Sequence, residues 1–470
     1  MNWKIITPEL YFFSTVAVFF TLAMISRTNS RQNYISALGL ALGGLLISLA
    51  SVKIQGSLSG VYRVDLFSQV LKVLLAMGFF LVVCICSELN GIPKQRHPEF
   101  YLLLSLCTLA MMMLVSSVEL LTMYVSLELT SYSLYILVAL RKGEGFQLEA
   151  GIKYFLIGSA TSAVMLFGMA SLYGATGKTT VSALLAVIPA HITSPMVIIG
   201  LTFTLCGFFF KLALFPFHLW APAVYQGAAN QVTAYIATAT KVAAIALLLR
   251  FATLGANSLY LVHVLAALAI ASMTLGNLVA IVQKDLKRLL AYSAVAHAGY
   301  VLIGILSMSQ NGIAAALFYA VAYIVMNYLC FLVVVKVAPD GENLEIVDLA
   351  GLHSRSPLLA MSIMVGVFSL GGIPPTIGFT SKFLVFAAAM ENGYFYLVLI
   401  GMINVAVSLY YYALVVKAAY FLKPSKDRRP IHLSLPLKVL IWAVVLIIVA
   451  GGIYPAFIHS LTTAAGTMLR

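Results

Sequence analysis

Apolar residues gather along this chain into long runs that are separated by short polar segments. A helix needs about 20 apolar residues to cross the hydrocarbon core of a bilayer. Fourteen runs meet that length, at residues 8–26, 34–54, 66–87, 99–116, 119–140, 152–174, 196–219, 229–254, 257–283, 289–307, 312–338, 357–390, 393–422 and 434–456. The twelfth run is long enough for a broken or tilted helix, and the stretch 178–195 is ambiguous. The pattern predicts an all-α polytopic membrane protein.

Composition excludes a water-soluble fold. The chain has 470 residues, of which 62% are hydrophobic and 9% are charged, against about 25% charged in an average soluble domain. The net charge of +13 comes from basic residues spread through short loops, whereas a nucleic-acid-binding surface needs them clustered. We therefore expect the protein to contact lipids and not to bind nucleic acid.

Basic residues are divided unevenly between the two sets of alternating loops. Fourteen crossings place both termini on one side of the membrane. The odd-numbered loops contain Arg27, Arg31, Lys94, Arg96, Arg141, Lys142, Lys284, Lys287, Arg288, Arg355, Lys423, Lys426, Arg428 and Arg429. The even-numbered loops and the termini contain Lys4, Lys53, Arg63, Lys178, Arg250 and Arg470. Because cytoplasmic loops are enriched in Lys and Arg, we predict that both termini face away from the cytoplasm.

Lys336, Lys417 and Lys438 sit near helix ends, where snorkelling to the headgroups explains them, but six other charged residues in apolar runs require an explanation. They are Lys72, Glu128, Lys153, Lys211, Lys241 and Lys382. A charge at the centre of a bilayer costs about 2.5 to 3.5 kcal/mol even on the mildest scale, and such residues usually mark an ion or proton path. A purely structural ion pair with a stray lysine is the alternative. We favour a chain of titratable groups through the membrane.

Helix breakers accompany two of these lysines. Pro216 follows Lys211 by five residues, and the segment Gly371–Pro375 precedes Lys382. Proline removes a backbone donor and clashes with the preceding turn, so an interrupted helix is expected at each place. A simple kink is the alternative, but paired interruptions in two halves of a chain are typical of transporters built from inverted repeats.

Spacing supports such a repeat. Lys382 lies 171 residues after Lys211, and His297 lies 169 residues after Glu128. Each offset covers five predicted crossings, and an odd number of crossings inverts the topology of the second unit. The pattern predicts two inverted units, each with one broken helix.

The cysteines indicate no further chemistry. All five lie in hydrophobic runs, without a CxxC or a Cys/His cluster of metal-ligand spacing. We expect neither disulfides nor a bound metal.

Several segments resemble the antiporter-like membrane subunits of respiratory complex I. They are GFFFKLALFPFHLWAPAVYQGA, ATKVAAIALL, VQKDLKRLLAYSAVAHAGY, GGIPPTIGFTSKF and LEAGIKYFLIGSATSAVMLFGMASLYG. Within this family, HLWAPAVYQGA and the short ends look most like the N subunits of the bacterial NADH-quinone oxidoreductases. Ala223 and the segment Ala229–Gln231 depart from the usual family pattern, which puts the local loop structure in doubt more than the function.

The resemblance implies a division of the chain and a set of site residues. Helices 1–3 occupy residues 1–98, a first five-helix repeat 99–254, a second, inverted repeat 255–422, and a last helix 423–470. The family's catalytic positions correspond to Glu128, Lys153, Lys211, His218, Lys241 and Lys382 in this chain. His297 joins them through the repeat spacing.

The implied function is proton translocation in the membrane arm of NADH-quinone oxidoreductase, driven by quinone reduction elsewhere in the complex. The chain then acts as an enzyme subunit in the bacterial inner membrane, beside other antiporter-like subunits. We expect no cofactor in this chain, and flavin, iron-sulfur clusters and quinone in partner subunits. The alternatives are a subunit of a multi-subunit Na+/H+ antiporter or membrane-bound hydrogenase, and a structural spacer that does not pump.

Overall fold

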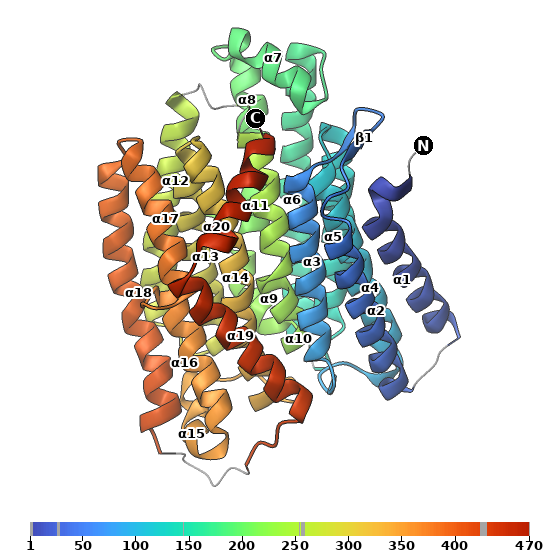
Figure 1. Ribbon diagram of the computed structural model, residues 1–470, viewed down its shortest axis with the longest axis vertical. Coiled ribbons are helices and arrows are strands. Elements are labelled where there is room, and N and C mark those ends of the chain that lie inside the picture. The colour runs from blue at the N-terminus through green and yellow to red at the C-terminus, as the bar shows by residue number, and fades with distance from the viewer. Residues whose placement is uncertain are drawn as a thin grey trace.

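The computed structural model describes residues 3–25, 29–143, 145–252, 254, 259–423 and 430–469. Long helices stand side by side along its longest axis (Figure 1). Thirteen described helices are long and apolar enough to cross a membrane, and α16 and α17 together form the broken twelfth one. The prediction of a polytopic all-α membrane protein is confirmed. Five basic residues used to predict orientation, Arg27, Lys426, Arg428, Arg429 and Arg470, lie outside the described residues.

The first part of the chain forms three long helices and a small hairpin. Its elements are η1 (Trp3–Ile6), α1 (Thr7–Met24), α2 (Ser30–Ala50), β1 (Gly56–Leu58), β2 (Tyr62–Val64) and α3 (Leu66–Cys84). The strands β1 and β2 pair in antiparallel fashion. The helix α3 begins in a capping box, in which the Ser68 backbone N–H donates to Asp65 Oδ1 at 2.8 Å and the Asp65 N–H to Ser68 Oγ at 3.0 Å.

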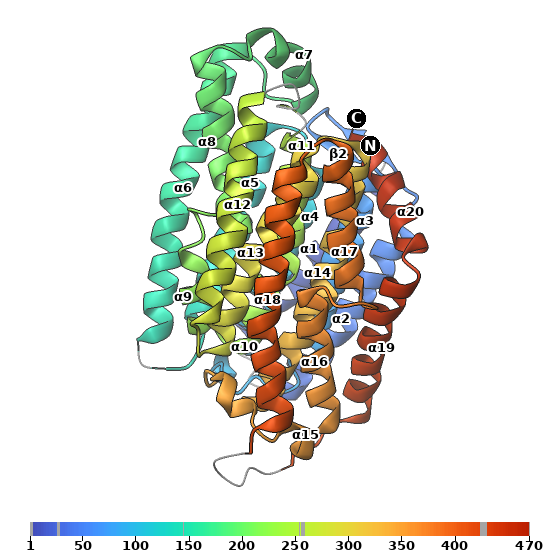
Figure 2. The same cartoon turned by 90° about the vertical axis from the view of Figure 1, so that its left-hand side faces the viewer.

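The next part contains the first broken helix. Its elements are η2 (Lys94–Arg96), α4 (His97–Ser116), α5 (Leu120–Ala139), α6 (Phe146–Thr176), α7 (Val181–His191), α8 (Pro195–Leu212), α9 (Trp220–Gly227), α10 (Asn230–Ala237) and α11 (Ala239–Ala252). The ambiguous stretch 178–195 is the short helix α7, at one end of the bundle (Figure 2).

The remaining part contains the second broken helix. Its elements are α12 (Leu259–Ile281), α13 (Leu286–Leu306), α14 (Gln310–Val337), η4 (Ile346–Leu349), α15 (Leu352–Arg355), α16 (Pro357–Gly371), α17 (Ile377–Glu391), α18 (Phe395–Phe421), α19 (Leu435–Ile453), α20 (Ala456–Gly466) and η5 (Thr467–Leu469). The helices α13 and α14 are almost wholly buried, whereas only 28–39% of the residues are buried in the 18-residue apolar stretches of α1, α2, α12, α18 and α19. The elements η1 and η5, close to the two termini, lie at the same end of the bundle in both views (Figures 1 and 2).

Three details of the predicted spans are wrong. The predicted run 196–219 extends past the end of the first half-helix, α8, at Leu212, and it stops before the second half-helix, α9, begins at Trp220. The run 229–254 is interrupted at Thr238 between α10 and α11. The hairpin and α20 were not predicted, because strands of three residues and an amphipathic helix of 11 residues lack the apolar length on which the span count depends.

The helix α19 packs closely against the backbone of the second break at one residue, Gly452. A Cβ on Gly452 would lie within 3 Å of backbone atoms of Pro375 and Thr376. Backbone atoms cannot move aside as the end of a flexible side chain can, so only glycine permits this contact.

Gly452→Ala should therefore lower the thermal stability of the purified chain, by about 1 to 3 kcal/mol from overpacking. Gly39→Ala is the matched control, because a Cβ on Gly39 of α2 meets nothing within 4 Å. It should be neutral or stabilise by up to about 1 kcal/mol through helix propensity. Thermal unfolding in detergent measures both, and equal midpoints would contradict the contact.

Candidate functional site

The first broken helix ends inside the bundle at Lys211 and Leu212. Ala213 follows in a left-handed conformation with φ of 60°. Its backbone N–H donates to Phe210 O at 3.0 Å, and that of Leu214 donates to Phe209 O at 2.9 Å. These bonds close the helix end but leave the carbonyls of the last two helical residues free for other donors.

The second broken helix ends in the same way at Leu370 and Gly371. Gly372 adopts φ of +84°, a conformation that glycine reaches without a side-chain penalty. The N–H groups of Gly372 and Ile373 donate to Phe368 O at 3.0 Å each. The chain re-enters a helix at Ile377.

A lysine ammonium occupies each of these two helix ends. Lys241 Nζ donates to the carbonyls of Lys211 at 3.3 Å and Leu212 at 3.0 Å. Lys382 Nζ donates to the carbonyls of Leu370 at 2.7 Å and Gly371 at 3.0 Å. The C-terminal end of a helix carries a partial negative charge that favours a cation. Both broken helices thus bind a buried ammonium through backbone atoms.

Lys211 is placed differently, because its side chain has no such acceptor. It is 7% exposed, and among the described residues its Nζ has no hydrogen-bond partner. The nitrogen lies 5.9 Å from the ring centroid of Tyr154 and 5.7 Å from that of Phe210. Aromatic rings at this distance attract a cation only weakly, so Lys211 is the least satisfied of the three ammonium groups.

Glu128 of α5 does not contact Lys211 directly. No ion pair within 4.0 Å joins the two among the described residues, although the Glu128 carboxylate interacts electrostatically with Lys211 at longer range. Glu128 Oε1 instead accepts a hydrogen bond from Ser162 Oγ at 2.5 Å. The two groups therefore form no direct ion pair in this structure, and the carboxylate is held on the α6 side.

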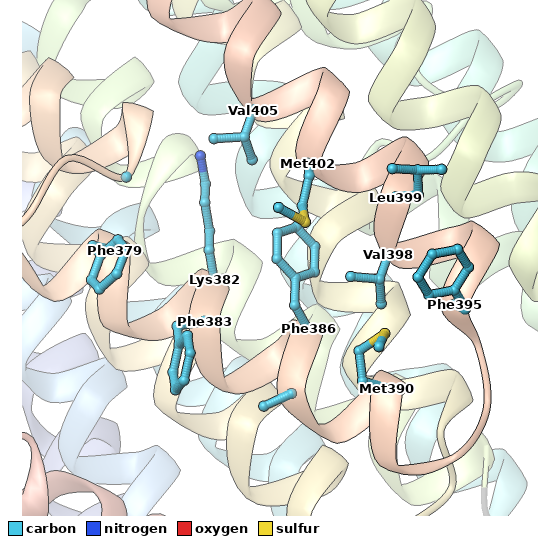
Figure 3. Close-up of a pocket in the computed structure, with 12 residues that line it drawn as sticks. Phe379, Lys382, Phe383, Phe386, Met390, Phe395, Val398, Leu399, Met402 and Val405 are labelled. Atoms are coloured by element: carbon cyan, nitrogen blue, oxygen red, sulfur yellow. The ribbon is translucent and has the colours of Figure 1, made fainter.

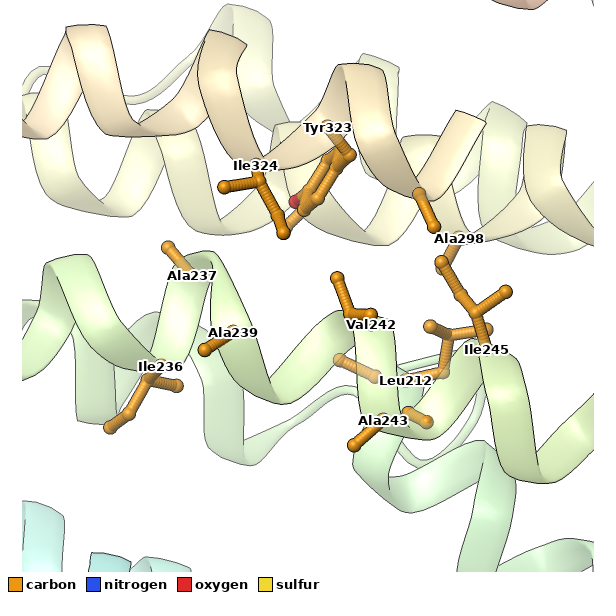
Figure 4. Close-up of a cluster of buried hydrophobic side chains, with 14 of the residues drawn as sticks. Leu212, Ile236, Ala237, Ala239, Val242, Ala243, Ile245, Ala298, Tyr323 and Ile324 are labelled. Carbon is orange, nitrogen blue, oxygen red and sulfur yellow. The ribbon is translucent and has the colours of Figure 1, made fainter. Parts of the chain in front are cut away.

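A small cavity connects Lys241 with His297 of α13. Its volume is about 10 Å³, and Leu212, Ile245 and Tyr323 also line it. This is close to the space that one water needs. Figure 4 shows apolar side chains of α10, α11, α13 and α14 around the end of α8, so the surroundings of the cavity have a low dielectric.

His297 is fully hydrogen-bonded by tyrosines. Its Nδ1 lies 2.6 Å from the Tyr319 hydroxyl, and its Nε2 lies 3.3 Å from the Tyr412 hydroxyl. The Tyr412 hydroxyl also lies 2.5 Å from Ser293 Oγ. Hydroxyl groups donate and accept equally well, so this network accommodates either ring tautomer.

Lys382 closes the row of buried basic groups. The Tyr300 ring is near both Lys382 and His297, because its centroid lies 4.9 Å from Lys382 Nζ and 5.8 Å from the centroid of the imidazole ring. Lys382 also borders a pocket of about 480 Å³ between α17 and α18, and every other residue in its lining is glycine or apolar (Figure 3).

Two sequence-predicted residues lie away from this row. Lys153 was expected inside an apolar run with the other site residues, but its side chain is 52% exposed on α6 and forms an ion pair with Glu149 at 2.5 Å. His218 lies between α8 and α9, half-buried against the rings of Phe215 and Tyr292. The structure thus brings Lys211, Lys241, His297 and Lys382 into one row and leaves Lys153 on the outside.

Two residues that were counted as loop charges are buried. Arg250 lies in the last turn of α11 and contacts Asp65 through Nη2 at 3.0 Å, with both side chains 5% exposed. Lys287 is fully buried in α13, where its Nζ donates to Ala228 O at 3.1 Å and Asn230 Oδ1 at 3.0 Å. Their burial could not be read from sequence, because both stand close to loops.

A buried ion pair in the first three helices was missed. Lys72 of α3 lies 2.5 Å from Glu9 of α1, with side-chain exposures of 0% and 8%. The Tyr62 hydroxyl donates to the same carboxylate oxygen. The sequence singles out Lys72 as a charge in an apolar run, but it does not identify Glu9 as its partner, because an acid at the start of the first run looks like an ordinary residue of a helix end. Among the described residues no group of three or more His, Cys, Asp or Glu side chains is arranged to hold a metal.

Comparison with known proteins relates this architecture to one family. The family model described as NADH:quinone oxidoreductase/Mrp antiporter, TM, matches residues 117–408. The protein named NADH-quinone oxidoreductase subunit N 2 of Syntrophobacter fumaroxidans is 56% identical over 471 residues, which cover 100% of both chains. The protein of the same name from Opitutus terrae is 42% identical and covers 98% of this chain and 97% of its own.

Solved structures share the fold. A chain of respiratory complex I from Thermus thermophilus has a TM-score of 0.84 at 32% identity, covering 96% of this chain and 98% of its own. A chain of the Mrp complex from Dietzia sp. has a TM-score of 0.89 at 19% identity, covering 100% and 98%. The second likeness concerns the fold alone.

The Glu9/Lys72 pair generates a stability prediction. Lys72→Met should destabilise the chain by about 3 to 5 kcal/mol, because it leaves a buried carboxylate without its partner. The double change Glu9→Gln/Lys72→Met should recover a large part of that loss. Lys153→Met, which breaks an exposed pair, should cost at most about 1 kcal/mol.

Thermal unfolding of the full chain in detergent compares these variants. A double variant as unstable as Lys72→Met would show that the pair does not account for the effect.

Proposed function

The chain belongs to the NADH-quinone oxidoreductase subunit N family, and from this premise we propose that it translocates protons along a buried row of basic side chains in the membrane arm of that complex. Electron transfer takes place in other subunits, which hold the flavin, the iron-sulfur clusters and the quinone. The free energy of quinone reduction drives the transport.

One observation carries this proposal. Lys241 and Lys382 are buried in the membrane core and are bound by helix-end carbonyls, without a carboxylate within 4.0 Å among the described residues. A carboxylate would hold the ammonium charge permanently through a strong ion pair. Burial disfavours that charge and the helix end favours it, so the two protonation states are closer in free energy than in an ion pair. A group of this kind can both accept and release a proton.

The geometry suggests an order of transfer. Lys211 receives a proton while Glu128 is nearby and loses it more easily when Glu128 is turned toward Ser162, because an opposite charge favours the protonated form of lysine. Lys241 is the next acceptor once its own amine is neutral, because the Lys211 charge acts on it from nearby. Its contact with Lys211 is to the backbone carbonyl, so water carries the proton between the two side-chain nitrogens. A water in the small cavity beside Lys241 then passes the proton to His297.

The step from His297 to Lys382 passes the Tyr300 ring and requires further water. Tyrosine hydroxyls at both nitrogens of His297 hold the imidazole in place and exchange protons with it. Release follows Lys382. Lys153 and His218 take no part in this row; each is proposed to act at the edge of the path, Lys153 toward the surface of α6 and His218 at the first break.

We place the two broken helices in two inverted five-helix units, residues 99–254 and 255–422, flanked by 1–98 and 423–470. In both broken helices the first half ends on an αL residue, which is followed by a short non-helical segment, as expected for equivalent positions. Other antiporter-like subunits pack beside the chain. The termini lie on the non-cytoplasmic side of the bacterial inner membrane, as the loop charges predict.

Two alternatives remain distinguishable from this proposal. A cation/proton antiporter subunit would share the fold, as the Mrp complex does, but would transport protons without NADH oxidation. A structural spacer would tolerate loss of the buried lysines once the complex has assembled.

Lys211→Ala should leave the complex assembled and slow coupled proton transport about tenfold or more, because a gap in the path raises the barrier by more than about 1.4 kcal/mol. Glu128→Ala should resemble it, whereas Glu128→Asp should keep part of the activity. The control is Lys284→Ala, an exposed lysine outside the row. Proton uptake per NADH oxidised, measured in proteoliposomes at matched assembly, gives the answer, and normal pumping by Lys211→Ala would reject the role.

A double variant tests whether the path is continuous. If one axis runs from Lys211 to Lys382, Lys382→Ala should impair pumping as severely as Lys211→Ala, and the double variant should be no worse than either. Independent channels in the two units predict partial losses that add. The same proteoliposome assay separates the two, and additive losses would overturn the single axis.

A further inference from the structure

A pocket of about 640 Å³ lies at the end of the bundle where α16 and α19 begin. The short helix α15 marks this end in Figure 1. Its lining includes three residues that carry basic side chains, Arg355, His432 and Lys438. Among the described residues, none that lines this pocket is acidic. The loop charges predict this end to be cytoplasmic, where the membrane surface is rich in anionic lipids.

Two helix ends reinforce the positive character of the pocket. Arg355 is the last residue of α15, and α16 begins at Pro357 directly after it; Lys438 lies in the first turn of α19. Neither α16 nor α19 has a side-chain hydrogen bond at its N-cap. The start of a helix carries a partial positive charge, which adds to that of the side chains.

The other wall of the pocket is apolar and continues along the outside of the bundle. Leu358, Met361 and Trp442 belong to it. On α19, Val439 is 62%, Trp442 50% and Leu446 63% exposed, and their spacing of three to four residues places them on one face. Tryptophan is enriched at the level of lipid headgroups. A polar, cationic head and an apolar track thus meet at one place.

We propose that this pocket binds the phosphate headgroup of an anionic phospholipid, with an acyl chain along the exposed face of α19. Arg355 and Lys438 contact the phosphate, and Trp442 packs at the boundary between headgroup and chain. A zwitterionic lipid carries no net charge to match the two cationic side chains, Arg355 and Lys438, and free phosphate has no acyl chain to cover the apolar face of α19. The site is independent of the buried lysine row, so it stands or fails separately from the proposed proton transport.

Trp442 provides a direct optical probe of occupancy. The chain has three tryptophans, and the difference between the parent and Trp442→Phe isolates the signal of this one. The full chain in nanodiscs is titrated with brominated phosphatidylglycerol or brominated phosphatidylcholine, whose bromines quench tryptophan on contact. Phosphatidylglycerol should quench Trp442 at much lower mole fraction than phosphatidylcholine.

Charge removal tests the contacts. Arg355→Gln/Lys438→Gln should reduce the preference for phosphatidylglycerol about 10- to 30-fold, the effect of two basic groups near an anionic surface. The matched control, Arg96→Gln/Lys284→Gln, removes two exposed charges at the same predicted side, outside the pocket, and should keep the preference. Inorganic phosphate at millimolar concentration should leave the quenching unchanged.

Three outcomes would overturn the proposal. They are equal quenching of the parent by the two lipids, an unchanged preference in the Arg355→Gln/Lys438→Gln variant, and relief of quenching by inorganic phosphate, which would identify a free anion as the ligand. The comparison of the two lipids on the parent protein leaves Arg355 and Lys438 unchanged, so it remains informative even if the double variant does not fold.

Discussion

A helix that ends within a membrane protein leaves carbonyl groups that lipid cannot satisfy, and this constraint organises the centre of the molecule. Each unsatisfied group costs several kcal/mol in an apolar medium, so both breaks require donors. Lys241 and Lys382 supply them. The same contacts make a buried ammonium tolerable without an acid. The break therefore stabilises the lysine and the lysine stabilises the break, whether the lysine comes from another helix, as Lys241 of α11 does, or from the second half-helix, as Lys382 of α17 does.

The fold could be predicted largely from apolar run length, because burial in lipid leaves few alternatives to membrane-spanning helices. The breaks were predictable as well, since Pro216 and the Gly371–Pro375 segment stand deep in apolar runs. The pairing of groups was not. Spacing along the chain relates Lys211 to Lys382, whereas the ammonium on the end of the first half-helix belongs to Lys241 of another helix. Long-range contacts of this kind depend on packing, which a linear pattern does not contain.

The orientation of side chains on a helix accounts for the other differences. Lys153 and Lys211 both stand in apolar segments, yet Lys153 faces outward with Glu149 while Lys211 is enclosed by aromatic rings. The apolar environment outside a membrane helix resembles its packed interior in composition, so hydropathy does not distinguish the two faces. Charge is equally ambiguous near a helix end, where Arg250 and Lys287 resemble loop residues but are buried.

The acceptors in both lysine contacts are main-chain atoms, and this has an evolutionary consequence. The side chains of Leu212, Leu370 and Gly371 do not form these bonds, so they can change without removing an acceptor. Only the donor residue and the shape of the helix end need to persist. The acceptor side of each contact is thus invisible in the amino-acid sequence. A comparison of sequences would record only the lysine, although in the molecule its ammonium is hydrogen-bonded to a helix end.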